Sequence, residues 1–246
     1  SELEEAAENG HLEVVKYLYT TGGVKRFDRS MDWAAENGHL EIIKYIHDQE
    51  RNRIPDILEW AEANGYSGFD KYILHESMNN KGTTYAMNYA AKNGHLEVVK
   101  YLHETVGAQC SAYAMDCAAG NGHLEVVKYL NETVSAACTA YAINQASQYG
   151  HFEVVKYLHE TVGAVCTSYA INQAAGNGYL EIVKYLCEIV GVRWLADAMN
   201  LAAANGYLKI VKYLHEIVSV ACTRITMGQA AQNGHLEVVA YLESIQ

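Results

Sequence analysis

Histidine and cysteine are the residue types here that could hold a metal ion, and the chain has 11 and 6 of them. Six of the histidines follow a glycine at one recurring position: His11, His39, His95, His123, His151 and His235. The His-Glu dipeptide, which forms the first two residues of the HExxH zinc motif, also recurs; examples begin at His103, His159 and His215. No second histidine follows, and ligands in separate repeating units cannot share an ion at the roughly 2.0–2.1 Å that zinc requires. The sequence therefore predicts no metal site and no cofactor.

The sequence also lacks the sets of residues that usually carry out nucleophilic catalysis. Each histidine belongs to a position that recurs along the chain, so none can be assigned to a Ser-His-Asp or Cys-His pair. No GxGxxG or P-loop motif occurs, and we expect paired carboxylates such as Glu4 and Glu5 on a solvent-exposed face. We predict that the chain is not an enzyme.

The cysteines are expected to be free thiols. Cys110, Cys138 and Cys166 are spaced at 28 residues, and Cys222 stands at the same recurring position. Equivalent atoms of adjacent helical units should lie about 8–10 Å apart, whereas a disulfide bond requires Cα atoms within roughly 4.4–6.8 Å. The other two cysteines, Cys117 and Cys187, are outside this set. The spacing predicts six thiols in an intracellular reducing compartment such as the cytoplasm.

These residues recur because the sequence itself repeats. A turn glycine is found at nine positions that are 27 to 29 residues apart: Gly10, Gly38, Gly65, Gly94, Gly122, Gly150, Gly178, Gly206 and Gly234. The whole chain, 1–246, is therefore expected to be one solenoid of nine copies, with approximate boundaries 1–25, 26–52, 53–81, 82–109, 110–137, 138–165, 166–193, 194–221 and 222–246. The third copy diverges most, with Ser67 and Asp70 at otherwise apolar positions, so we expect copies one to three to open first.

Each copy is expected to hold two helices joined by the turn glycine. In the copy at 138–165, Thr139 is a suitable N-cap, and a helical period places small apolar residues on one face: Ala142, Ile143, Ala146 and Ser147. The variable residues fall on the other face: Tyr141, Asn144, Gln145 and Gln148. Gly150 should end the first helix. The second helix should run from about His151 to Glu160, with a solvated Glu-Lys pair on its outer face.

The segment Ala90–Ala108 reads AAKNGHLEVVKYLHETVGA. It resembles the ankyrin repeat, whose hallmark is AA-x-x-GH-x-x-VV-x-x-L-x-x-x-GA, and the resemblance extends along essentially the whole chain. It implies an all-α, ankyrin-like solenoid of nine helix-turn-helix repeats, with the first helices on the concave side. The ankyrin period is 33 residues, so the shorter period here predicts that the β-hairpin fingers between repeats are truncated or absent.

The charge of the chain narrows the class of partner. The formal net charge of −11 disfavours nucleic acid, which requires Lys and Arg. No run of 18 or more apolar residues occurs, so no membrane span is predicted. The remaining partner class is a protein, bound by a monomeric chain.

Two sets of tyrosines are distinguished by position. The set in the Lys-Tyr-Leu segment, from Tyr17 to Tyr241, falls on the apolar stripe of the second helix and is predicted to be core. A second set falls on the variable face of the first helix, where exposed aromatic residues could be binding hot spots or could stack on one another. The predicted partner-binding residues on this face are Trp33, Trp60, Tyr85, Tyr89, Lys92, Tyr113, Tyr141, Gln145, Gln148, Tyr169 and Gln173.

The function predicted from these features is a non-catalytic protein–protein interaction scaffold that binds its partner on the concave face. The shortened repeat is similar to ankyrin proteins of oomycetes and other protists, some of which are effectors inside host cells. That resemblance implies a pathogen effector acting on a host protein, in the host cytoplasm. One alternative is a partner-recruiting segment of a larger enzyme such as a ligase or kinase, and another is self-assembly through the ends of the solenoid.

Overall fold

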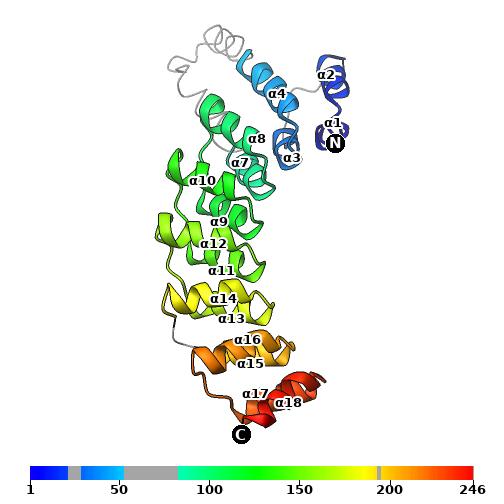
Figure 1. Cartoon of the computed structure of the whole chain (residues 1–246). Coiled ribbons are helices and arrows are strands. Elements are labelled where there is room, and N and C mark those ends of the chain that lie inside the picture. The colour runs from blue at the N-terminus through cyan, green and yellow to red at the C-terminus, as the bar shows by residue number, and fades with distance from the viewer. Residues whose placement is uncertain (22–28, 53–82, 193–194, 246) are drawn as a thin grey trace, which may run out of the picture. The chain divides into compact units, whose positions relative to one another are not determined.

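The structure is a computed structural model that describes residues 1–21, 29–52, 83–192 and 195–245. These residues form two compact units, one of Ser1–Ala118 with Lys128–Ala137, the other of Ala119–Val127 with Cys138–Gln246. Every regular element in the described ranges is a helix (Figure 1). The all-α prediction is therefore confirmed, and no described connection forms a β-hairpin. The third predicted copy, including Trp60, lies outside the described residues.

The described residues of the first unit form three helix pairs, of which the third continues into a π-helical segment, Leu102–Val106. The pairs are α1 (Glu2–Glu8) with α2 (Leu12–Thr21), α3 (Ser30–Glu36) with α4 (Leu40–Asn52), and α7 (Thr83–Lys92) with α8 (Leu96–Tyr101). The next pair, α9 (Ala112–Gly120) and α10 (Leu124–Glu132), is divided between the two units.

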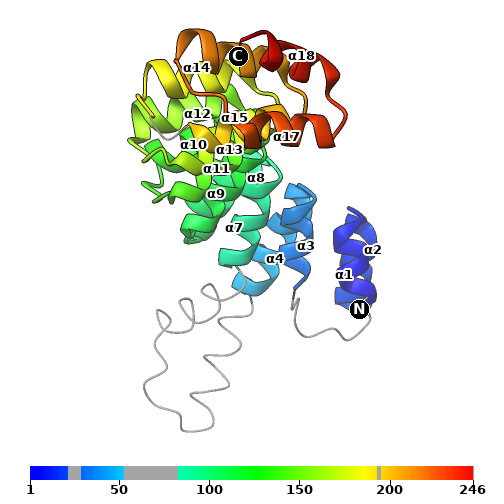
Figure 2. The same cartoon turned by 90° about the horizontal axis from the view of Figure 1, so that it is seen from below.

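The second unit contains four helix pairs: α11 (Ala140–Gln148) with α12 (Phe152–Tyr157), α13 (Ser168–Gly176) with α14 (Leu180–Glu188), α15 (Ala196–Ala204) with α16 (Leu208–Lys212), and α17 (Arg224–Gln232) with α18 (Leu236–Ser244). Two second helices end in π-helical segments, Leu158–Val162 after α12 and Tyr213–Ile217 after α16. First helices pack on first helices, from α11 through α13 and α15 to α17, and second helices pack on second helices (Figure 2).

Small side chains let the first helices approach one another closely. Ala142, Ile143 and Ala146 of α11 are fully buried, and Ala170 and Ile171 of α13 repeat the pattern. This face was predicted from the helical period of the sequence. Its dense packing, which leaves no room for a longer side chain, explains why alanine recurs there in copy after copy.

The turn glycine has two separate reasons to be glycine. Gly150 has φ = 83°, a left-handed conformation that other residues rarely adopt. In addition, a Cβ atom on Gly150 would lie 2.3 Å from Cε1 of Tyr179 in the next copy. At Gly122 the ring in that place is His151. In these copies, the aromatic or imidazole ring therefore covers the turn of the copy against which it packs.

The second and fourth copies pack directly against each other in the first unit. Helix α3 contacts α7, and His95 Nε2 lies 3.0 Å from the carbonyl oxygen of Glu36. The same type of hydrogen bond joins the consecutive copies one and two, where His39 Nε2 lies 2.9 Å from the carbonyl oxygen of Glu8. A direct contact between copies two and four was not predicted from the sequence.

Candidate functional site

Exposed tyrosines mark the first helices of both units. Tyr85 on α7 is 60 % exposed, and Tyr113 on α9 is also exposed. In the second unit, Tyr141 on α11 is 53 % exposed and Tyr169 on α13 is 48 % exposed. In the part of the chain that the structure describes, the rings of Tyr141 and Tyr169 form no aromatic pair, so they do not stack on each other. The structure thus places these four predicted residues on the surface.

The polar residues predicted beside the tyrosines are less accessible. Gln145, Gln148 and Gln173 are half-buried along α11 and α13, as are Tyr89 and Lys92 on α7. On α11, Tyr141, Gln145 and Gln148 are spaced i, i+4 and i+7, so they lie on one stripe.

Trp33 is separated from this set. It is half-buried on α3, and the guanidinium carbon of Arg29 lies 5.2 Å from its ring centroid, a cation–π distance. A hollow of about 480 Å³ beside it is lined by Ser1, Glu4, Glu5, Glu8 and Asn9. No described contact brings Trp33 together with the exposed tyrosines.

Asparagine side chains on the first helices join consecutive copies. The Thr167 hydroxyl donates to Asn144 Oδ1 at 3.0 Å, and the Thr226 hydroxyl donates to Asn200 Oδ1 at 2.7 Å. Asn172 stands at the same position as Asn144, but Leu195 occupies the position equivalent to Thr167. The Oδ1 of Asn172 is buried without a hydrogen-bond partner among the described residues. The assignment of Asn144 to the variable face was therefore wrong, because its side chain points toward the next copy.

The threonines that precede the first helices do not all act as N-caps. The Thr139 hydroxyl accepts a hydrogen bond from the backbone nitrogen of Tyr141 at 3.0 Å, as predicted. Thr167 makes no side-chain capping bond; its hydroxyl is used for the bond to Asn144. A threonine at this position can therefore serve its own helix or the contact with the previous copy.

The tyrosines of the second helices form the most regular polar contact between copies. The Tyr185 hydroxyl donates to Glu160 Oε1 at 3.2 Å, and His159 Nδ1 lies 2.8 Å from the oxygen of the Tyr185 hydroxyl. The corresponding sets are Tyr129 with His103 and Glu104, and Tyr241 with His215 and Glu216. The His-Glu dipeptides thus hold the tyrosine of the following copy.

The hydrogen-bond pattern fixes the form of these histidines. A tyrosine hydroxyl has one proton, and it is donated to the glutamate. The imidazole Nδ1 of His159 must therefore carry a proton and donate it to Tyr185. Burial, together with Glu160, raises the pKa of Tyr185 to about 12. The hydroxyl consequently stays protonated throughout the neutral range.

The prediction that all these tyrosines are core is only partly correct. Tyr185 and Tyr213 are buried, at 8 % exposed each, and Tyr101, Tyr129 and Tyr157 are half-buried. Tyr17, by contrast, is 65 % exposed. The apolar stripe places each ring against the neighbouring helices, but the hydroxyl needs a polar partner, so the side chain remains at the edge of the core.

The outer faces of the second helices carry the predicted Glu-Lys pairs. They are Lys16–Glu13, Lys44–Glu41, Lys100–Glu97 and Lys184–Glu181, with N···O distances of 2.7 to 3.5 Å. The glutamates are at least 69 % exposed. Exposed pairs of this kind contribute about 0–1 kcal/mol each, so this face is solvated and chemically uniform.

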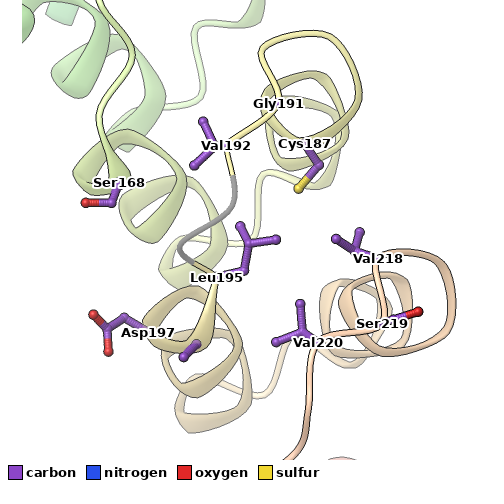
Figure 3. A pocket seen from close by; sticks show the side chains of 10 residues that line it. Ser168, Cys187, Gly191, Val192, Leu195, Asp197, Val218, Ser219 and Val220 are labelled. Carbon is purple, nitrogen blue, oxygen red and sulfur yellow. The ribbon is translucent and has the colours of Figure 1, made fainter.

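A separate hollow lies in the second unit beside the loops after α14 and α16. Its volume is about 670 Å³, and Cys187, Val192, Leu195, Val218 and Val220 line it with Ser168, Gly191, Ala196, Asp197 and Ser219 (Figure 3). Most of the side chains that face it are apolar, while Asp197 points away (Figure 3). Burial raises the pKa of the Cys187 thiol to about 11, so this thiol is protonated and a poor nucleophile at neutral pH.

Disulfide bonds, metal-binding clusters and membrane-spanning helices are absent from the described residues. No disulfide bond joins any of the six cysteines, as the repeat spacing predicted. Within the described ranges, no group of three or more His, Cys, Asp or Glu side chains could hold a metal ion. Over the same ranges, no helix has both the length and the apolar character needed to cross a membrane.

Two models of known families match the chain. The model for ankyrin repeats in many copies matches residues 31–103 and 87–130, and the model for three ankyrin repeats matches residues 115–198 and 143–224. Together they cover more than half of the sequence, and the chain belongs to the ankyrin repeat family. A search of curated proteins finds no match. Ankyrin repeats are protein–protein interaction modules and are generally non-catalytic.

Proposed function

We propose that this chain binds its protein partner through the variable face of its first helices, with the exposed tyrosines as anchors. One observation carries the proposal: tyrosines at equivalent positions of α7, α9, α11 and α13 are about half exposed or more, although the aromatic ring would be better shielded from water. Interface hot spots are enriched in tyrosine. The second helices offer only repeated Glu-Lys pairs, which give a partner little energy or discrimination.

The predicted residues do not contribute equally. Tyr85, Tyr113, Tyr141 and Tyr169 are the anchors, and Gln145, Gln148 and Gln173 are half-buried neighbours that can donate hydrogen bonds. Tyr89 and Lys92 sit beside Tyr85 on α7. We leave Trp33 out of the binding face, because Arg29 already covers its ring.

The proposal is tested with a double substitution in the second unit, Tyr141→Ala with Tyr169→Ala. Loss of a hot-spot aromatic residue costs at least about 2 kcal/mol, so the affinity for a partner should fall at least roughly thirtyfold. Alanine favours the helix, and circular dichroism should show an unchanged fold. The matched control reverses charges on the second helices, Lys156→Glu with Lys184→Glu, and should leave binding unchanged.

The assay compares the proteins captured from a cell lysate by the wild-type chain and by both variants, identified by mass spectrometry. The proposal predicts a protein that is captured by the wild type and the lysine variant but lost with the tyrosine variant. If the lysine variant loses the captured protein and the tyrosine variant keeps it, the binding face is on the second helices instead.

We also propose a reducing compartment as the location of the chain. Location in a reducing compartment is supported by the separate thiols, because burial raises the pKa of both Cys166 and Cys187 to about 11 and makes them slow to oxidise. A monomeric state, an effector role in a host cell, and the alternative of a recruiting segment in a larger enzyme rest on the sequence alone. No described contact favours the alternative.

A further inference from the structure

The first-helix face of the second unit is almost without charge. Helices α11 and α13 contain no Asp, Glu, Lys or Arg, and α15 contains only Asp197, in a chain of which 19 % is charged. The groups that this face presents are the tyrosine rings and hydroxyls, the glutamine amides, and Leu201, which is 37 % exposed. A ligand for this face must therefore be recognised by aromatic contact and neutral hydrogen bonds.

The spacing of the helices restricts the conformation of an extended ligand. Helices α11, α13 and α15 pack side by side, and packed helices lie about 8–10 Å apart. A polyproline II helix rises about 3.1 Å per residue with three residues per turn, so it repeats every ~9.3 Å. Side chains on one face of a β-strand repeat at about 6.6–6.8 Å, and one turn of an α-helix advances about 5.4 Å. Of these three conformations, only polyproline II has a repeat length that matches the spacing of neighbouring first helices, so that one ligand turn lies over each ankyrin repeat.

The hydrogen-bonding groups suit the same ligand. A polyproline II backbone makes no internal hydrogen bonds, and proline has no N–H, so such a segment mainly offers carbonyl acceptors. The tyrosine hydroxyls and the amides of Gln145, Gln148 and Gln173 are donors along the path of the ligand. Grooves with aromatic side chains bind proline-rich segments in other folds, because the ligand is already ordered and loses little entropy.

We propose that the second unit binds a proline-rich segment in the polyproline II conformation, laid across α11, α13 and α15 with one ligand turn per repeat. This rests on the proposed function and specifies its partner. Tyr141 and Tyr169 pack against the pyrrolidine rings of successive turns. A basic residue at the end of the segment that lies over α15 meets Asp197, the one charged side chain on these three helices.

The experiment uses the full chain and a fluorescent decaproline peptide, with binding followed by anisotropy. A Gly-Ser peptide of the same length is the matched control, because it is flexible and lacks the rings. Decaproline should bind saturably and the Gly-Ser peptide should not. Tyr141→Ala with Tyr169→Ala should weaken decaproline binding at least tenfold, while Lys156→Glu with Lys184→Glu should change it less than twofold. Because decaproline has no charged side chain to meet Asp197, raising NaCl from about 50 to 500 mM should leave its affinity nearly unchanged.

The outcomes separate this inference from the proposed function. If decaproline does not bind at millimolar protein, or binds the tyrosine variant as well as the wild type, the polyproline inference is wrong. If in that case a captured protein is still lost with the tyrosine variant, the first-helix face is the binding face and only the ligand class is mistaken. Loss of decaproline binding at high salt would also overturn the inference, since it would show that charges carry the affinity.

Discussion

Asp32 is the buried group whose replacement should have the clearest effect on stability. It stands on α3 at the position occupied by Asn88, Asn144 and Asn200 in later copies. The residue is 7 % exposed, and its Oδ1 is buried without a hydrogen-bond partner in the described residues. Burial raises the pKa of its carboxyl from 3.8 to about 6, against the attraction of Arg29. We predict that Asp32→Asn stabilises the protein at neutral pH.

The size and sign of the effect follow from the pKa. A rise from 3.8 to about 6 corresponds to roughly 3 kcal/mol at about 1.36 kcal/mol per pH unit. Because the folded state holds the proton more tightly than the unfolded chain, this stabilising contribution is complete below the unfolded pKa and is lost as the pH rises through about 6. Asparagine avoids that loss, and the pKa of about 6 already includes the weak attraction of Arg29, whose side chain is 61 % exposed. The net gain above pH 6.5 should be about 1–3 kcal/mol.

The assay is urea unfolding followed by far-ultraviolet circular dichroism at several pH values between about 4.5 and 7.5. The difference in the free energy of unfolding between variant and wild type should grow with pH and level off near pH 7. Asp48→Asn is the matched control, because Asp48 is an exposed aspartate on the neighbouring helix α4. A difference that is the same at every pH, or a variant less stable than wild type at pH 7.5, would refute the electrostatic reasoning.

Three further changes test the contacts between copies. Tyr185→Phe removes a hydroxyl bonded to two side chains and should cost about 1–2 kcal/mol in urea unfolding at pH 7. It should also reduce the loss of stability at high pH, because the contribution of the raised pKa is complete below pH 10 and is lost as the pH rises through about 12. Asn144→Ala should cost about 1 kcal/mol. Asn172→Ala should cost measurably less, since the Oδ1 of Asn172 has no donor among the described residues; equal losses would contradict the assigned contacts. Replacing residues 48–82 by the connection Glu132–Cys138 keeps the register of the repeat and should preserve cooperative unfolding, because α3 already contacts α7; a molten or aggregated product would show that this contact needs the removed residues.

The sequence was sufficient to predict the elements and the buried faces. The helical period identified Ala142, Ile143 and Ala146 as core, and all three are fully buried. Gly150 was expected in a left-handed turn, and its φ is 83°. These features depend only on the sequence of a single copy, and the repetition of that copy along the chain makes the pattern easy to recognise.

The contacts between copies were harder to predict. Asn144 was placed on the variable face because a helical wheel describes one helix and not the neighbour that approaches it. The use of His159 and Glu160 as partners of Tyr185 needed the distance between consecutive copies, which the sequence does not contain. A signal was nevertheless present, because the His-Glu dipeptide recurs one repeat before a Lys-Tyr-Leu segment.

The contact between copies two and four has a related explanation. Each copy presents a turn glycine on one side and a ring on the other, so the docking surfaces of different copies are nearly interchangeable. A Cβ atom on Gly38 would lie 2.7 Å from Nδ1 of His95, as it would at Gly10, where Cε1 of His39 is 2.7 Å away. Such a surface specifies how two copies stack but not which two. Sequence order therefore could not predict this neighbour.

Tyrosine serves two roles in this chain, and the surroundings of each hydroxyl decide which. The hydroxyl of Tyr185 is held by His159 and Glu160, so a partner could use it only by displacing contacts that stabilise the stack. The hydroxyls of Tyr141 and Tyr169 have no such partners among the described residues, and half of each ring is in water. Removing these two rings should therefore cost binding energy and little stability. The opposite is expected at Tyr185, and this contrast supports the proposal that a partner binds the first helices.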